Sequence, residues 1–446
     1  MQKSKINLVS LGCSKNTVDS ESLAGKLIKE GFSVEFDMVK PSFDFVIINT
    51  CGFIDKAKEE SINVILEFVN LRKESRETFK IIVYGCLAER YKRELLQEIP
   101  EIDLLCGIMS DKRIISYIQT QTTSTTQKIS DEQYNGYSTT VTKRKLSAAE
   151  HYAYIKISEG CDRRCSFCAI PLIKGKHVSR PIEDIVEEAN MLVKQGVKEI
   201  ILIAQDTSYY GLDLYGERKL YDLLKSLCRT NVHWIRLQYT YPNQFPTKIL
   251  DLMNEEKKIC HYLDMPLQHI NDRILNSMNR NITADRIISL INNVRNKVKD
   301  IAFRTTLIVG YPSETQAEFE ELKQFVTQTR FDRMGAFTYS KEEGTMAGRM
   351  NDDVSEREKQ RRLYELTDIQ EKISFKLNQN KIGKTFETII DRKEGEYFIG
   401  RTQYDSPEVD NEVLIPIKDN PSLKIGEFYR IKITDATEFD LYGQTE

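Results

Sequence analysis

Hydrophobic runs of five or six residues alternate with helix-like patterns over residues 1–120. The runs cover residues 6–11, 43–48 and 80–84. The helical stretch after the second run repeats its apolar residues at i, i+3, i+4 and i+7, the spacing of one helix face that packs on a sheet. These residues are Ile62, Ile65, Leu66 and Val69. Strands that alternate with amphipathic helices predict a parallel α/β domain here.

The pattern changes after residue 120. Residues 121–147 are rich in threonine, serine and glutamine and contain few large apolar side chains. Such a segment cannot bury enough apolar surface to form a core, so we predict a linker between two domains.

Strand and helix patterns resume over residues 148–378. A strand at 152–157, a helix opened by Pro181 and a strand at 199–204 form one β-α-β unit. Further strand candidates, with helical stretches between them, are residues 234–239, 262–267, 304–309 and 335–339. This repeat predicts an open or closed α/β barrel, partly like a TIM barrel.

The last part of the chain, residues 379–446, has a different pattern. Short alternating segments at 385–390, 413–417 and 429–433 are separated by glycine, proline and aspartate. These segments predict a small β-barrel. The expected fold class of the whole chain is α/β, with this barrel as a third domain.

Composition changes the picture mainly through cysteine. The 446 residues carry 64 basic and 67 acidic side chains, a net charge of -3 that names no partner. The start lacks a signal-peptide pattern, and no segment approaches the roughly 18 apolar residues of a membrane span, so we expect a cytoplasmic location without a membrane. Nine cysteines in a reducing compartment favour metal binding or catalysis over disulfides.

Three cysteines lie within eight residues, just beyond the first strand of the central domain. They are Cys161, Cys165 and Cys168. Zinc normally takes four ligands, often as paired Cys-x2-Cys elements, and the sequence contains no second pair. Three thiolates on a 4Fe-4S cluster would leave one iron without a protein ligand, and a small substrate could chelate that iron.

A second set of three cysteines is far apart in sequence. Cys13, Cys51 and Cys86 each follow a predicted strand of the first domain. The carboxyl ends of parallel strands share one edge of a sheet, so these residues can become neighbours. The adjoining glycines, residues 12, 52 and 85, would let the backbone approach a bulky cofactor. The alternative is that all three are ordinary core cysteines, as we expect for Cys106, Cys228 and Cys260.

The spacing Cys-x3-Cys-x2-Cys, with an aromatic residue before the last cysteine, resembles the radical S-adenosylmethionine (SAM) superfamily. Together with residues 12–16, residues 49–52 and the terminal small barrel, it makes the whole chain resemble the methylthiotransferases. This resemblance implies SAM and two 4Fe-4S clusters as cofactors, a TRAM-like terminal barrel and an external electron donor. It assigns Cys161, Cys165 and Cys168 to the cluster that cleaves SAM. It assigns Cys13, Cys51 and Cys86 to an auxiliary cluster that supplies or carries sulfur.

The resemblance also implies contacts with SAM. The main chain near Phe167 would meet the adenine, and Gln205 and Arg304 would face the methionine part. The alternatives are that Phe167 packs in a core, Gln205 caps a strand end and Arg304 is a solvated charge. No acid-base catalytic residue is predicted, because a radical derived from SAM would abstract the hydrogen.

The methylthiotransferases include branches that modify adenosine in transfer RNA and a branch that modifies an aspartate of small-subunit ribosomal protein twelve. Several local strings resemble the ribosomal-protein branch: residues 11–21, 51–54, 164–171, 262–269 and 335–340. A transfer-RNA methylthiotransferase remains the alternative. A non-enzymatic iron-sulfur carrier would not need the central barrel.

The charge of the terminal barrel favours the same branch. From Lys381 to Glu446, nine lysines and arginines face fourteen aspartates and glutamates, a net charge of -5. A barrel that grips RNA should be basic, because lysine and arginine contacts to phosphate supply the affinity. We therefore expect a basic ribosomal protein, not a nucleic acid, to dock on acidic residues such as Glu408 and Asp410. A merely solvated acidic surface is the alternative.

Overall fold

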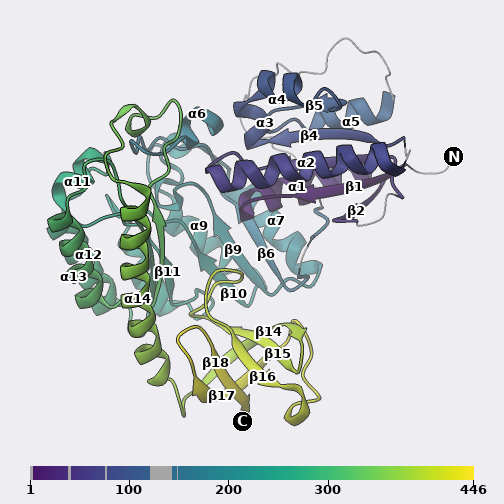
Figure 1. Cartoon of the computed structure of the whole chain (residues 1–446). Coiled ribbons are helices and arrows are strands. Elements are labelled where there is room, and N and C mark those ends of the chain that lie inside the picture. The colour runs from purple at the N-terminus through teal and green to yellow at the C-terminus, as the bar shows by residue number, and fades with distance from the viewer. Residues whose placement is uncertain (1–3, 39–41, 76–77, 121–142, 148) are drawn as a thin grey trace. The chain divides into compact units, whose positions relative to one another are not determined.

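A computed structural model describes residues 4–38, 42–75, 78–120, 143–147 and 149–446 (Figure 1). The chain divides into two compact units. The first comprises residues 1–148, 154–163 and 168–180, and the second comprises residues 149–153, 164–167 and 181–446. Most of the predicted linker, 121–147, lies outside the described residues. Within the described ranges, no helix has the length and apolar character needed to cross a membrane.

The first unit contains a five-stranded parallel sheet in the order β2-β1-β3-β4-β5. Its strands are β1 (Lys5–Ser10), β2 (Ser33–Phe36), β3 (Phe45–Thr50), β4 (Lys80–Gly85) and β5 (Leu104–Leu105). Its helices are α1 (Ser14–Lys29), α2 (Asp55–Ser75), α3 (Cys86–Arg90), α4 (Lys92–Glu98) and α5 (Asp111–Thr120). The predicted α/β class is confirmed.

Helices cover both faces of this sheet. Alternate residues of β3 point to opposite faces, so Val46 and Ile48 pack in one core cluster and Phe45 and Ile47 in another. Helix α2 joins the first cluster, whereas α1 and α5 join the second. The prediction that Leu66 packs inward is wrong: its side chain is 39% exposed, because it lies at the edge of the stripe centred on the buried residues of α2.

The first unit also contains the segment that surrounds the three clustered cysteines. Strand β6 (Tyr152–Lys156) has residues in both units, and is followed by β7 (Ser158–Glu159). The loop with the cysteines comes next, then α6 (Ile170–Lys174) and β8 (Val178–Ser179). Strands β7 and β8 form an antiparallel pair, which closes the segment on itself.

The second unit alternates parallel strands with helices that flank them (Figure 1). Strand β9 (Glu199–Ile203) pairs with β10 (Trp234–Leu237), and β12 (Ala302–Val309) pairs with both β11 (Tyr262–Asp264) and β13 (Arg333–Thr338). The helices are α7 (Ile182–Lys194), α8 (Leu212–Tyr215), α9 (Leu220–Leu227), α10 (Lys248–Glu255), α11 (Asp272–Ser277), α12 (Ala284–Lys297), α13 (Gln316–Thr329) and α14 (Glu356–Gln379). This is the predicted α/β barrel architecture.

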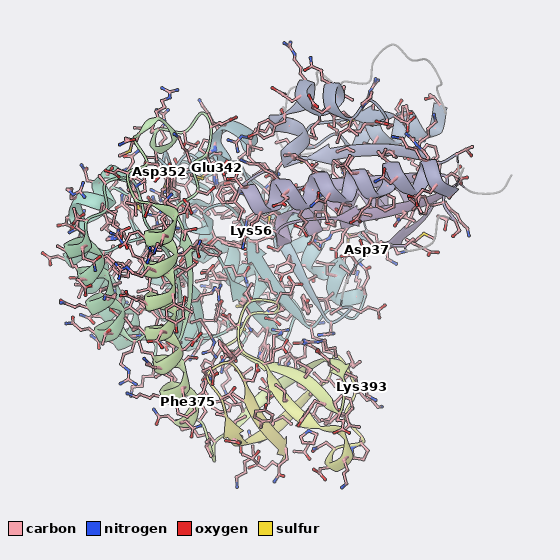
Figure 2. The ribbon with its side chains drawn as sticks, viewed as in Figure 1. Asp37, Lys56, Glu342, Asp352, Phe375 and Lys393 are labelled. Atoms are coloured by element: carbon pink, nitrogen blue, oxygen red, sulfur yellow. The ribbon has the colours of Figure 1, made fainter. Side chains whose placement is uncertain are left out.

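The chain ends in a closed five-stranded barrel in the order β14-β15-β16-β18-β17. The strands are β14 (Thr385–Glu394), β15 (Tyr397–Thr402), β16 (Val413–Pro416), β17 (Phe428–Ala436) and β18 (Leu441–Thr445). Side chains such as Phe398, Ile415 and Ile431 fill its interior. The predicted small β-barrel is confirmed. Phe375 on α14 is partly exposed, and Lys393 lies on the barrel surface (Figure 2).

Buried charges join this barrel to the rest of the second unit. Glu199 of β9 lies 2.6 Å from the Nε of Arg236 and 2.7 Å from the Nη1 of Arg401, and all three side chains are at most 2% exposed. Arg401 also lies 2.6 Å from Asp391, which contacts His151 at 2.7 Å. Asp405 of the barrel forms a second buried ion pair, with Arg333 of β13. The barrel is therefore attached by ion pairs that water does not reach.

Candidate functional site

The three cysteines that are far apart in sequence follow neighbouring strands of the first unit. Cys13 follows β1, Cys51 follows β3, and Cys86 begins α3 directly after β4. These strands are adjacent and parallel in the order β1-β3-β4, so their carboxyl ends lie side by side. The structure thus brings the three loops to one edge of the sheet, as the sequence predicted.

Two glycines allow these loops to pack closely. Gly12 has a φ of +91°, and a Cβ there would lie 2.6 Å from Cys51 Cβ and 2.9 Å from Cys51 Sγ. A Cβ at Gly52 would lie 2.7 Å from the Cα of Leu87. Any side chain at either position would push apart the loops that carry Cys13, Cys51 and Cys86.

Two polar side chains for which the sequence predicted no role, Asn16 and Ser61, hold these loops in place. The Nδ2 of Asn16 donates to the carbonyl oxygens of Leu11 at 2.8 Å and Thr50 at 3.2 Å. The Ser61 hydroxyl, on α2, donates to the Cys51 carbonyl and accepts from the Cys51 amide, both at 3.0 Å. Asn16 could have been found from the sequence, because it follows Cys13 by only three residues. Ser61 could not, because its contact with Cys51 depends on how α2 packs.

The thiols of this set interact electrostatically. Burial raises the pKa of Cys51, and Cys13 raises that pKa further. Burial raises the pKa of Cys86 to about 12 against the opposing effect of Lys174, and Cys13 and Cys51 act in the same direction as burial. Three thiolates so placed repel one another unless bound iron compensates their charge.

The chemistry of this donor set fits an iron-sulfur cluster. In the part of the chain that the structure describes, no three histidine, cysteine, aspartate or glutamate side chains are arranged to hold a single metal ion. Cluster ligands need not converge on one ion, because each thiolate binds a different iron. Three interacting thiols at a glycine-lined sheet edge therefore fit a cluster better than a mononuclear site.

The clustered cysteines lie in the loop between β7 and α6. Cys161 and Cys168 are partly exposed, and the Sγ of Cys161 accepts a hydrogen bond from the Arg163 amide at 3.4 Å. Cys165 is buried in the second unit. Its neighbour Ser166 is held by a 2.8 Å hydrogen bond with the Tyr311 hydroxyl.

Arg280 is a site residue that sequence reasoning missed. Its Nη1 donates to the Sγ of Cys165 at 3.4 Å, and its guanidinium stacks 4.2 Å from the centre of the Tyr241 ring. The side chain is buried, and its Nε has no hydrogen-bond partner among the described residues. A lone arginine after a short helix gives no local sequence signal, because only the tertiary fold places it beside Cys165.

The residues predicted to contact SAM lie in different surroundings. The Phe167 side chain packs against Ile274, Met278 and Tyr311. Gln205 is half-buried, two residues beyond the end of β9.

Arg304 lies near the amino end of β12, where its Nη1 is 2.5 Å from Asp410. Its side chain is 17% exposed, so it is not the solvated charge of the alternative interpretation. Contacts of these residues with SAM stay predictions.

A buried group of four charges adjoins Cys86 within the first unit. Lys174 Nζ lies 3.1 Å from Glu159 and 3.8 Å from Asp19, and Lys156 contacts both of these carboxylates. Burial alone would raise the pKa of Glu159, but Lys156 and Lys174 outweigh it and hold that pKa at about 2. The Glu159 carboxyl group is therefore ionised at neutral pH.

Three family models match parts of the chain. They are the radical SAM superfamily over residues 155–326, the uncharacterized protein family UPF0004 over residues 5–107, and the TRAM domain over residues 382–445. Among solved structures, the radical SAM methyltransferase TsrM from Kitasatospora setae matches with a TM-score of 0.56 at 15% identity. That match covers 78% of this chain and 77% of the other, and it supports the fold alone.

Curated relatives match over the full length. A protein of Flavobacterium johnsoniae named ribosomal protein uS12 methylthiotransferase RimO is 50% identical, covering 100% of this chain and 98% of its own. A protein of the same name from Phocaeicola vulgatus is 49% identical, covering 99% of both chains. The family predicted from the motifs is confirmed: the chain belongs to the radical SAM methylthiotransferases, in the branch of the ribosomal protein uS12 methylthiotransferases.

Proposed function

We propose that the protein attaches a methylthio group to an aspartate of ribosomal protein uS12, using SAM and two 4Fe-4S clusters. The observation that carries the proposal is the full-length match, at 49–50% identity, to proteins named for this activity. The two sets of three cysteines support the two clusters. The aspartate and the use of two SAM molecules are implied by the family resemblance.

In this proposal, Cys161, Cys165 and Cys168 hold one cluster, and Cys13, Cys51 and Cys86 hold the other. When bound, the clusters supply the reductive cleavage of SAM and the sulfur to be transferred. The protein contributes orientation: Ser166 anchors the middle of the cysteine loop through Tyr311, and burial of Cys165 excludes water. An external one-electron donor completes the system.

The main chain at Phe167, together with Gln205 and Arg304, remains the proposed set of SAM contacts. For the negative charge of the methionine part, Arg280 is the better-supported partner. Arg304 is engaged by Asp410, whereas Arg280 is buried beside Cys165 with one N–H group unpaired among the described residues. A buried cation beside the cluster suits a carboxylate.

We further propose that uS12 docks on acidic residues of the terminal barrel, and that the protein works in the cytoplasm, where ribosomal proteins are found. The net charge of -5 supports the docking. The suitable carboxylates are exposed ones such as Glu394, Glu396 and Glu408. Asp410 is not suitable, because its side chain is fully buried against Arg304.

Charge reversal tests this docking. Glu394→Lys with Glu396→Lys should weaken uS12 binding and make the remaining binding less sensitive to salt. Lys393→Glu, at the adjacent surface position, is the matched control and should not weaken binding (Figure 2). Unchanged binding in the double variant would refute docking through this surface.

The activity test is mass spectrometry of uS12 after incubation with anaerobically reconstituted enzyme, SAM and reductant. A gain of about 46 mass units on an aspartate is expected, since a methylthio group replaces hydrogen. Cys86→Ala should abolish the gain and lower bound iron from about eight to about four atoms per chain. Cys106→Ala, also at a buried cysteine, should change neither. Modification of transfer RNA alone would establish the alternative branch.

A further inference from the structure

The buried charges of Lys174 and Glu159 are not ligands of either proposed cluster. Lys174 and Glu159 are 3% and 1% exposed, and their side chains lie 3.1 Å apart. Two unpaired buried charges would each be very unfavourable, and even a paired set often stabilises a fold no better than apolar residues of similar size. A functional reason for keeping these charges is therefore worth testing.

The position of Lys174 suggests that reason. It ends α6, the helix that begins two residues after Cys168, while Ile173 of the same helix packs against Cys86. Cys86 begins α3, which packs on α6, so the buried ammonium group of Lys174 is carried by the helix that covers the Cys86 loop. Glu159, two residues before Cys161, forms a 3.1 Å ion pair with Lys174. One ion pair thus adjoins ligands proposed for both clusters.

We propose that Lys174 is a positioning residue of the auxiliary site, where its buried ammonium group, held by Glu159, stabilises negative charge on the sulfur atoms at Cys86. This inference rests on the proposed function, because it requires a cluster at Cys13, Cys51 and Cys86. A fixed positive charge beside a cluster favours the reduced, more negative state. Lys174 should therefore raise the reduction potential of the auxiliary cluster.

The test isolates the auxiliary cluster in the full-length chain. Cys161, Cys165 and Cys168 are replaced by alanine, and the reconstituted protein is titrated with dithionite in the presence of mediator dyes while the reduced cluster is followed by electron paramagnetic resonance. Lys174→Gln should lower the reduced-to-oxidised ratio at a fixed potential about tenfold, which is about 59 mV for a one-electron couple. Lys174→Arg, which keeps the charge, should restore the ratio.

Lys176→Gln is the matched control, because it removes one positive charge from an exposed position two residues away. It should leave the ratio unchanged. If Lys174→Gln does not fold, the pair Glu159→Gln with Lys174→Gln leaves no unpaired carboxylate and should shift the ratio in the same direction.

Three results would overturn the inference: no shift in the neutral variants, an equal shift in Lys174→Arg, or an equal shift in Lys176→Gln. If the variant without Cys161, Cys165 and Cys168 binds no iron, that result would instead refute the auxiliary cluster, and with it the inference. Iron content measured before the titration separates these failures.

Discussion

Glu199 offers the most direct test of how the terminal barrel is attached. Its two carboxylate oxygens are shared between the guanidinium groups of Arg236 and Arg401, at 2.6 and 2.7 Å, and none of the three side chains is more than 2% exposed. Glu199→Gln keeps the size of the side chain and removes the negative charge that both arginines share. We expect the barrel contact to weaken.

The size of the effect follows from the burial. Removing one partner of a buried ion pair costs about 3–5 kcal/mol, since the remaining charge is left without compensation. Arg401 keeps Asp391 at 2.6 Å, so the lower end of the range, about 3 kcal/mol, is expected. For a large unit the free energy of unfolding falls by about 3 kcal/mol per molar urea, so the urea midpoint of unfolding should fall by about 1 M.

The assay uses a natural reporter. Trp234 is the single tryptophan of the chain, and its buried ring lies 4.7 Å from Phe428 on the barrel strand β17. Its fluorescence in urea should follow the loss of the barrel contact. Glu446→Gln is the control, because its pair with Arg430 is exposed and solvent screens it, so its loss should leave the midpoint almost unchanged. Equal midpoint shifts in the two variants would refute the reasoning from burial.

Two further predictions follow from the structure. Burial, and then repulsion from Arg333, lowers the pKa of Lys381 from 10.5 to about 8. Between these two pH values the unfolded chain binds more protons than the native chain. The free energy of unfolding therefore rises with pH over this range. Lys381→Met should lose that rise, and identical pH profiles of the urea midpoint would contradict it. Gly12→Ala should halve the bound iron by displacing Cys51. Gly31 has a similar φ of +94° but open space around it, so Gly31→Ala should retain all the iron. Equal iron content in both variants would contradict the packing argument.

Much of the fold was predictable because its strands are strongly patterned. The meeting of Cys13, Cys51 and Cys86 at one edge did not require the strand order, since the carboxyl ends of parallel strands share an edge in any order. Strand β2 was missed because it is four residues long, lies at the sheet edge and buries only one side chain. Such a strand lacks the hydrophobic run that identified β3 and β4.

The residues that sequence reasoning did not find act through tertiary contacts. Arg280 reaches Cys165 across 115 positions of the chain, and Lys174 acts on Cys86 electrostatically only because α6 packs on α3. Neither contact leaves a periodic or spaced signal. Motif spacing therefore identifies metal ligands more readily than the charges that surround them.

The terminal barrel shows why net charge is an incomplete guide to a partner. Its excess of acidic residues predicted a basic partner, but part of that excess meets basic residues of the same unit. Asp410 lies against Arg304, Asp405 against Arg333, and Asp391 against His151. A count along the sequence does not separate these buried carboxylates from exposed ones such as Glu394 and Glu396, because both kinds carry the same formal charge. Docking of uS12 can depend only on the exposed group, so the charge-reversal experiment must leave the buried carboxylates intact.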